Sequence, residues 1–358
     1  MSIIVFLVGI PITKYVSEYF KTGFKRGISL YIWHTLFCFL YAWYVTQYGG
    51  DAGYYYFTSP NDRLVFSFGT IAIKYLTSFF SNILGLSFIA TSLVYNIFGF
   101  IGLMAFDAAL RYAVLQKKRT IRGLASVIVF LPSVSFWSAG IGKDSLAFMS
   151  AGLALWAALN FKQRVWIMIP SIIIMLFVRP HIAAILIISF TFSIIFQKRL
   201  SFIFRVGIGI IALITTILIL PISLKYSKLE NSKITQSLEK YIHQRASYNK
   251  EGGGSVDIST MPITSQVGTY LFRPFPFEAH SIPSFAASLD NMVLLYLFVW
   301  GITSMIKRRY ISKKENRLFL WTYSLITLLI LSTTTANLGI SVRQKWMFTP
   351  MLIFLMIS

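Results

Sequence analysis

The chain contains 358 residues, 56% of them hydrophobic and 13% charged, which leaves too little polar surface to cover a soluble globular protein of this size. Its formal net charge of +21 would suggest a nucleic-acid partner for a soluble chain, but in a membrane protein it favours basic loops sorted across a bilayer and no nucleic-acid partner. The one cysteine, Cys38, excludes an internal disulfide and a cysteine-based metal site, so we expect it to pack in the interior.

Apolar runs predict an all-α, polytopic membrane protein with about eleven transmembrane helices. The N-terminal run lacks the basic leader and the cleavage pattern of a signal peptide, so we interpret it as a retained first span. Residues 64–84 carry Lys74 among many serines, threonines and phenylalanines, which favours an interfacial or partly re-entrant outer helix. The expected spans are residues 2–20, 28–47, 86–108, 123–138, 145–160, 165–178, 181–196, 206–222, 289–306, 318–335 and 345–358.

Basic residues are concentrated in alternate loops, which sets the predicted orientation. Five loops hold 19 of the 33 lysines and arginines, and the positive-inside rule places them in the cytoplasm. The N-terminus is then outside and the C-terminus inside. We expect one transmembrane domain, 1–358, with an outer loop at 48–85 that contains the interfacial helix. A second, long outer loop at 223–288 should contain an amphipathic helix, because its apolar residues between 224 and 241 have helical spacing.

The stretch FWSAGIGKDSLAFM places Lys143 and Asp144 at the centre of 38 otherwise uncharged residues, 123–160. A helix of that length would exceed the hydrocarbon core, so the chain must turn, and Gly140 and Gly142 permit the turn. The predicted hairpins 123–160 and 165–196 are short for two spans each, so their tips should lie in a cavity below the outer surface. Charges at that depth should be paired or should bind a charged ligand. The alternative is that Asp144 only caps the next helix.

In FVRPH, Pro180 should end one helix or start the next. Arg179 and His181 then flank a helix break in apolar surroundings. A guanidinium there suits a phosphate or pyrophosphate group, which it can bind through two hydrogen bonds. The alternatives are that Arg179 reaches the lipid headgroups or pairs with Asp144 or Asp51, and that His181 is a structural hydrogen-bonding residue rather than a proton carrier.

The segment YGGDAGYYYFT follows the second predicted span. Asp51 is a candidate general base, or a residue that orients an acceptor hydroxyl. Tyr54 and Tyr55 offer ring faces on which a sugar can stack. An aromatic belt at the membrane interface, with a turn at Asp51, is the alternative.

Two further outer segments add candidate substrate contacts. In YLFRPFPFEAHS, Arg273, Glu278 and His280 lie in a segment that either covers a cavity or docks as a plain loop. Arg343 and Lys345 lie at the outer end of the last run, where the positive-inside rule disfavours them. With Lys143, Arg179 and Arg273 they form a candidate cluster of five cations. Four scattered histidines and one cysteine give no zinc-binding spacing and no nucleotide loop is present, so we expect neither metal nor cofactor.

Four strings, LPSVSFWSAGIGKDSLAF, FVRPHIAAIL, LFRPFPFEAHS and NLGISVRQKWMF, resemble those of the bacterial O-antigen and exopolysaccharide polymerase-like group, Wzy-type and EpsG-like. The resemblance implies a GT-C-like glycosyltransferase in the bacterial cytoplasmic membrane, with its active site facing the periplasm or outside. The implied reaction joins oligosaccharide repeats linked to undecaprenyl or another polyprenyl pyrophosphate, for O-antigen, capsule or exopolysaccharide. It also implies pyrophosphate contacts at Arg179, Arg273 and Arg343, and a base at Asp51, Asp144 or His181.

Two other functions stay open at this stage. One is a lipid-phosphate-sugar-dependent glycosyltransferase or glycan ligase on the same face. The other is a flippase or transporter of lipid-linked glycans, which should show related halves and charges near mid-membrane. The expected partners are the lipid-linked oligosaccharide, membrane lipid, a flippase and a chain-length regulator.

Overall fold

The computed structural model describes residues 1–57, 66–196, 254–306 and 316–358, and a few positions between 201 and 214. Within these ranges the regular elements are helical, and paired extended backbone is limited to one bridge between Ser255 and Asn337. The predicted all-α class is therefore confirmed for the described chain. The amphipathic helix expected at 224–241 and most of the span expected at 206–222 lie outside the described residues.

Six helices in the described ranges are long and apolar enough to cross a membrane. Two shorter apolar helices, Gln163–Val178 and Pro180–Ile195, follow one another in the middle of the chain. Many large apolar side chains of the long helices face outward, including Trp43, Tyr296 and Val299, each more than half exposed. Apolar surface of this kind suits contact with lipid. The six candidates are Ser2–Tyr19, Phe24–Tyr48, Phe88–Ala113, Arg119–Ser138, Ile282–Ile306 and Arg317–Thr334.

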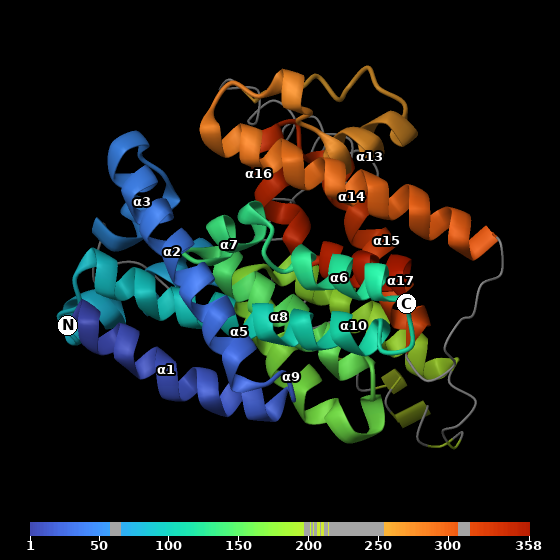
Figure 1. Ribbon diagram of the computed structural model, residues 1–358, viewed down its shortest axis with the longest axis horizontal. Helices are drawn as coiled ribbons and strands as arrows, with labels where there is room; N and C mark the ends of the chain where they lie inside the picture. The colour runs from blue at the N-terminus through green and yellow to red at the C-terminus, as the bar shows by residue number, and fades with distance from the viewer. Residues whose placement is uncertain are drawn as a thin grey trace. The chain divides into compact units, whose positions relative to one another are not determined.

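The chain divides into two compact units, one formed by Met1–Arg179 with Ile357–Ser358 and the other by Pro180–Met356. The N-terminal unit is coloured blue to green in Figure 1. Its helices are α1 (Ser2–Tyr19), α2 (Phe24–Tyr48), α3 (Asp51–Phe57), α4 (Thr70–Ser78) with a π-helical turn (Phe79–Ile83), α5 (Phe88–Ala113), α6 (Arg119–Ile128), α7 (Pro132–Ser138), α8 (Lys143–Ala158) and α9 (Phe161–Val178).

The core of the N-terminal unit is the crossing of α5 and α8, which lie side by side in Figure 1. The helices approach closely because Gly102 and Gly152 face each other, so a Cβ atom at Gly152 would overlap the backbone of Gly102. Small residues permit such backbone contact between helices in a membrane. Almost every residue of α8 after its first turn is buried as a result.

A buried polar network joins α2, α5 and α7. The ring of His34 bonds through one nitrogen to the amide oxygen of Asn96 and through the other to the hydroxyl of Ser138 at 2.9 Å. The amide nitrogen of Asn96 donates to Thr35. Each polar group here has a partner, so burial of the network is compatible with an apolar interior. Cys38 is also buried, as expected.

The candidate span Arg119–Ser138, which contains the run expected at 123–138, is interrupted within its length. Helix α6 ends at Ile128 and α7 begins at Pro132, with Leu131 in an extended conformation. Proline starts a helix readily because its missing amide is not needed there, but it does not continue one. Part of the segment predicted as an interfacial or partly re-entrant helix is helical: α4 is followed directly by the π-helical turn, and Lys74 is buried.

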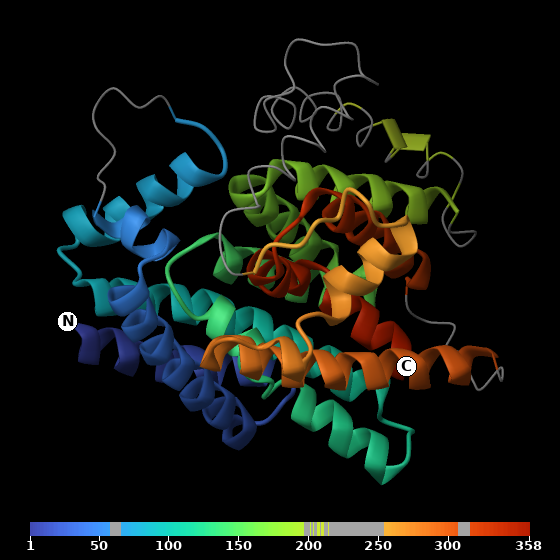
Figure 2. The ribbon, with the colours of Figure 1, turned by 90° about the horizontal axis from the view of Figure 1, so that it is seen from above.

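The C-terminal unit runs from yellow-green to red in Figure 2. Helix α13 packs on α14, α15 and α16. Asn316 and Asn337 cap α15 and α16 by accepting hydrogen bonds from the amides of Phe319 and Ile340. The helices are α10 (Pro180–Ile195), α13 (Ile263–Phe272), α14 (Ile282–Ile306), α15 (Arg317–Thr334), α16 (Leu338–Gln344) and α17 (Thr349–Ile357), with short 3₁₀ turns at Pro276–Glu278 and Lys345–Met347.

Candidate functional site

The turn between α7 and α8 places the Lys143–Asp144 pair at the start of α8, as the glycines predicted. Gly140 packs directly on the ring of Tyr41, leaving no room for a side chain. Tyr41 precedes the last residue of α2, Tyr48, by seven residues, which corresponds to about 10 Å along the helix axis. The tip is therefore recessed relative to the end of α2.

Arg179 and Asp144 form an ion pair at this tip. Nη2 of Arg179 donates to Oδ1 of Asp144 at 2.7 Å, and the side chains are 9% and 18% exposed. The pair forms because Pro180 starts α10, so that α9 ends at Val178 and Arg179 leaves the helix. Nε of Arg179 is buried without a hydrogen-bond partner among the described residues. Since a guanidinium has five N–H donors, Arg179 retains donor capacity for a ligand.

Lys143 lies beside this pair in the sequence and is held by Thr70. Its Nζ donates to the Thr70 hydroxyl at 2.7 Å. The amide of Gly69 donates to the carbonyl of Phe177 at 2.9 Å, which fixes the start of α4 against the end of α9. Gly69 has φ of +88°, a conformation that favours glycine. The segment that contains Gly69 and Thr70 therefore reaches the same tip as Asp144 and Arg179.

The tyrosines of α3 extend the site. Tyr55 is buried and lies next to Gly142, whose added Cβ would be 4.0 Å from the Tyr55 ring. The Nζ of buried Lys74 lies 3.9 Å from the centre of the Tyr54 ring, a cation–π contact. Asp51 is the first residue of α3 and is exposed. The structure thus places Tyr55 beside the turn before α8, whereas Tyr54 contacts Lys74 of α4.

The C-terminal unit contains the other predicted site residues. Arg273 Nε donates to both carboxylate oxygens of Glu278, at 2.9 and 3.1 Å, and the amide of Phe275 donates to the same carboxylate. The hydrogen bonds from Arg273 lower the pKa of Glu278, with the Phe275 amide adding to the shift. Arg273 and Glu278 therefore stabilise their own turn, in agreement with the docked-loop alternative. His280 is exposed beyond this turn.

Lys345 is fully buried. Its ammonium donates to the side-chain oxygen of Asn291 and to the carbonyl of Leu271 at 3.3 Å, and the Asn291 amide donates to Pro274. These bonds tie α13 and α14 to the turn before α17. The side chain of Lys345 thus joins internal elements rather than lying on a surface. Arg343, on α16, and His181, on α10, are each partly buried.

Some residues at these sites were not identified from the sequence. Thr70 and the buried pair Asp290–Asn291 had no motif around them, although two consecutive polar residues at the start of an apolar run are themselves a signal. Arg26 also binds Asp107 through two nitrogens, at 2.6 to 3.0 Å, in the N-terminal unit. Within the described ranges no three histidine, cysteine or acidic side chains converge to hold a metal ion.

The tip of the N-terminal unit combines a carboxylate, a guanidinium with a spare donor, an ammonium and the start of α8. A helix start favours anions because its first amides are free and its dipole is positive there. The arrangement can bind an anionic group and offers Asp144 as a proton acceptor nearby. Comparisons of the chain with protein-family models, with curated proteins and with solved structures give no match.

Proposed function

We propose that the protein is a membrane glycosyltransferase that polymerises polyprenyl-pyrophosphate-linked oligosaccharide repeats at the outer face of the bacterial cytoplasmic membrane. In this proposal it adopts a GT-C-like arrangement of about eleven spans. The observation that supports it best is the recessed Arg179–Asp144 pair, with Lys143 beside it at the start of α8. A buried guanidinium with an unused N–H group suits a pyrophosphate that enters from the bilayer.

The proposed reaction needs one proton acceptor and stabilisation of a leaving group. A hydroxyl oxygen of the acceptor sugar attacks the anomeric carbon of the donor, and a new C–O bond forms there. The bond between that carbon and the pyrophosphate oxygen breaks, and the pyrophosphate leaves with the electron pair. Asp144 takes the hydroxyl proton, while Arg179 and Lys143 stabilise the charge on the leaving group.

The pair has to open for this chemistry. When pyrophosphate binds Arg179, the guanidinium exchanges part of its contact with Asp144 for contacts with the anion. The carboxylate then becomes available to the acceptor hydroxyl. Tyr54, on the same helix as Tyr55 and about half exposed, offers a ring face for the sugar.

A ligase or single-sugar transferase would use the same groups, so the distinction between these enzymes lies in the product. Purified protein in liposomes is supplied with the lipid-linked repeat that is made by the enzymes encoded next to its own gene. The products are then separated on a gel. A ladder at multiples of the repeat supports a polymerase. One added increment supports a single transfer, and movement of unchanged substrate across the bilayer supports a flippase.

Arg179→Ala and Asp144→Asn are each expected to lower the rate of polymer formation by about 10²-fold or more. Each change removes a group that acts on the transition state. Asp107→Asn is a matched control, since it also breaks an arginine–aspartate pair in the same unit. The Asp107→Asn variant should form as much polymer per folded molecule as the unchanged protein. A full ladder from folded Arg179→Ala protein would contradict the proposed role.

A further inference from the structure

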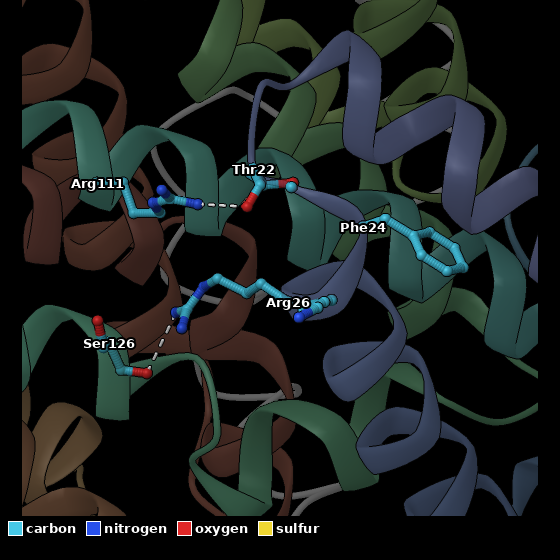
Figure 3. A pocket seen from close by; sticks show the side chains of 7 residues that line it. Thr22, Phe24, Arg26, Arg111 and Ser126 are labelled. Atoms are coloured by element: carbon cyan, nitrogen blue, oxygen red, sulfur yellow. Dashed lines mark hydrogen bonds between the residues drawn. The ribbon is translucent and has the colours of Figure 1, made fainter.

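A pocket of about 480 Å³ lies at the end of the N-terminal unit where α2 begins and α5 ends. Figure 3 shows Arg26 and Arg111 extending into the space between Thr22 and Ser126. Its volume is in the range of sites that hold small organic ligands. This pocket is separate from the tip at Asp144, because the two lie toward opposite ends of α2. It is lined by Thr22, Gly23, Phe24, Lys25, Arg26, Arg111 and Ser126.

The pocket carries an excess of positive charge. Arg26 is bound to Asp107, which offsets its charge. Lys25 and Arg111 add two cations to the lining. Among the described residues, the Arg111 side chain makes one hydrogen bond, from Nη1 to the carbonyl of Thr22 at 2.6 Å, which leaves other N–H donors of its guanidinium for a ligand. Like charges that line one pocket repel one another, so an anion in the pocket would be favourable.

Backbone amides add to the anion-binding character. Helix α2 starts at Phe24, its N-cap residue is Gly23, and no side chain caps its first amides. No acidic residue occurs in its first turn. The free amides and the positive end of the helix dipole therefore point toward the same pocket as Lys25 and Arg111.

The surroundings favour a lipid as the source of the anion. Phe24 lines the pocket and is 45% exposed, so apolar surface lies next to the cations. Ser126 belongs to α6, an amphipathic helix that carries Arg119 and Arg122 near its start. A basic amphipathic helix beside a basic pocket is typical of contact with anionic headgroups at a membrane surface. A free phosphate would make no use of the exposed ring.

We propose that this pocket binds the phosphate of an anionic phospholipid in the leaflet that faces the basic loops, with the acyl chains passing Phe24. Lys25, Arg111 and the first amides of α2 bind the phosphate oxygens, while Arg26 stays paired with Asp107. Bound lipid then links the α1–α2 loop to α5 and α6.

The test measures lipid binding to the full chain in neutral detergent by native mass spectrometry. Phosphatidylglycerol, phosphatidylcholine and inorganic phosphate are added separately. We expect the protein to retain a bound phosphatidylglycerol molecule in the spectrum and to show little bound phosphatidylcholine. Lys25→Gln and Arg111→Gln should each weaken phosphatidylglycerol binding by about fivefold, as expected for a cation close to a headgroup.

Lys14→Gln is the matched control, because Lys14 is an exposed cation of α1 that does not line the pocket. It should change phosphatidylglycerol binding by less than about twofold, since an exposed charge contributes little. Equal losses in Lys14→Gln and Lys25→Gln would show general surface attraction and overturn the pocket assignment. Binding of inorganic phosphate without phosphatidylglycerol would overturn the lipid assignment. If Arg111→Gln does not fold, Lys25→Gln alone decides the result, because the Lys25 side chain is exposed, so its loss should disturb the fold little.

Discussion

Asp144 and Arg179 are 35 residues apart in the sequence, yet Arg179 Nη2 lies 2.7 Å from Asp144 Oδ1. The contact joins the start of α8 to the end of α9, two antiparallel helices that also share hydroxyl contacts between Ser150 and Ser171. A recessed pair of this kind is stable only while both partners are present, since removal of one leaves the other with an uncompensated charge.

The first prediction is energetic coupling between these two residues. Asp144→Asn and Arg179→Gln should each lower the free energy of unfolding by about 2 kcal/mol, less than for a fully buried pair because both side chains are partly exposed. The double variant should lose less unfolding free energy than the sum of the two single losses, and the difference should be about 1 kcal/mol. Thermal unfolding in detergent measures all three. If the two single losses simply add in the double variant, the interaction between the two side chains contributes nothing to stability.

The second prediction concerns the helix crossing in the core. Gly152→Ala should destabilise the protein by about 2 kcal/mol, because the added methyl group meets the backbone of Gly102, which cannot move aside as a flexible side chain would. Gly123→Ala is the control, since Gly123 lies in α6 with open space around it. That change should raise helix stability by about 0.5 to 1 kcal/mol. Unfolding midpoints in the same detergent compare the two, and equal midpoints would argue against a tight crossing.

The third prediction separates a structural from a substrate-binding role for Lys345. Lys345→Met should lower the free energy of unfolding by about 2 to 4 kcal/mol, because it leaves the oxygen of Asn291 and the carbonyl of Leu271 buried without a donor. A Lys345→Met protein with unchanged stability and weakened substrate binding would instead place Lys345 in the site.

The fourth prediction is a pH dependence in the turn at Arg273. The pKa of Glu278 is lower in the folded chain than in the unfolded chain, so the unfolded state binds the proton more tightly. The stabilisation from Arg273 is therefore fully present above the ordinary glutamate pKa of about 4.3, and it decreases as the pH falls through the lower, folded value. Hydrogen exchange of the Phe275 amide should accelerate at acidic pH after correction for the intrinsic rate. Glu278→Gln should remove this dependence, and the same acceleration in that variant would exclude Glu278 as its cause.

The sequence by itself determined the helical class, the presence of several apolar helices long enough to cross a membrane, and the turn at Gly140–Asp144. These features follow from local chemistry: a long uncharged stretch must form backbone hydrogen bonds within a helix, and a charged pair at its centre forces a break. The start of a helix at Pro180 follows in the same way from the missing amide of proline. One alternative weighed for Arg179, its pairing with Asp144, is the arrangement that the structure contains.

Only the tertiary structure decided which partner each charge takes. Arg273, Lys345 and Arg179 have the same sign and were grouped as candidate substrate contacts from the sequence. Their environments differ: Arg273 binds Glu278 in its own turn, Lys345 is buried between helices, and Arg179 keeps an unpartnered nitrogen in a recessed tip. Pairing depends on distances between residues far apart in the chain. Those distances are set by close helix crossings such as that of Gly102 with Gly152, which no local sequence pattern encodes.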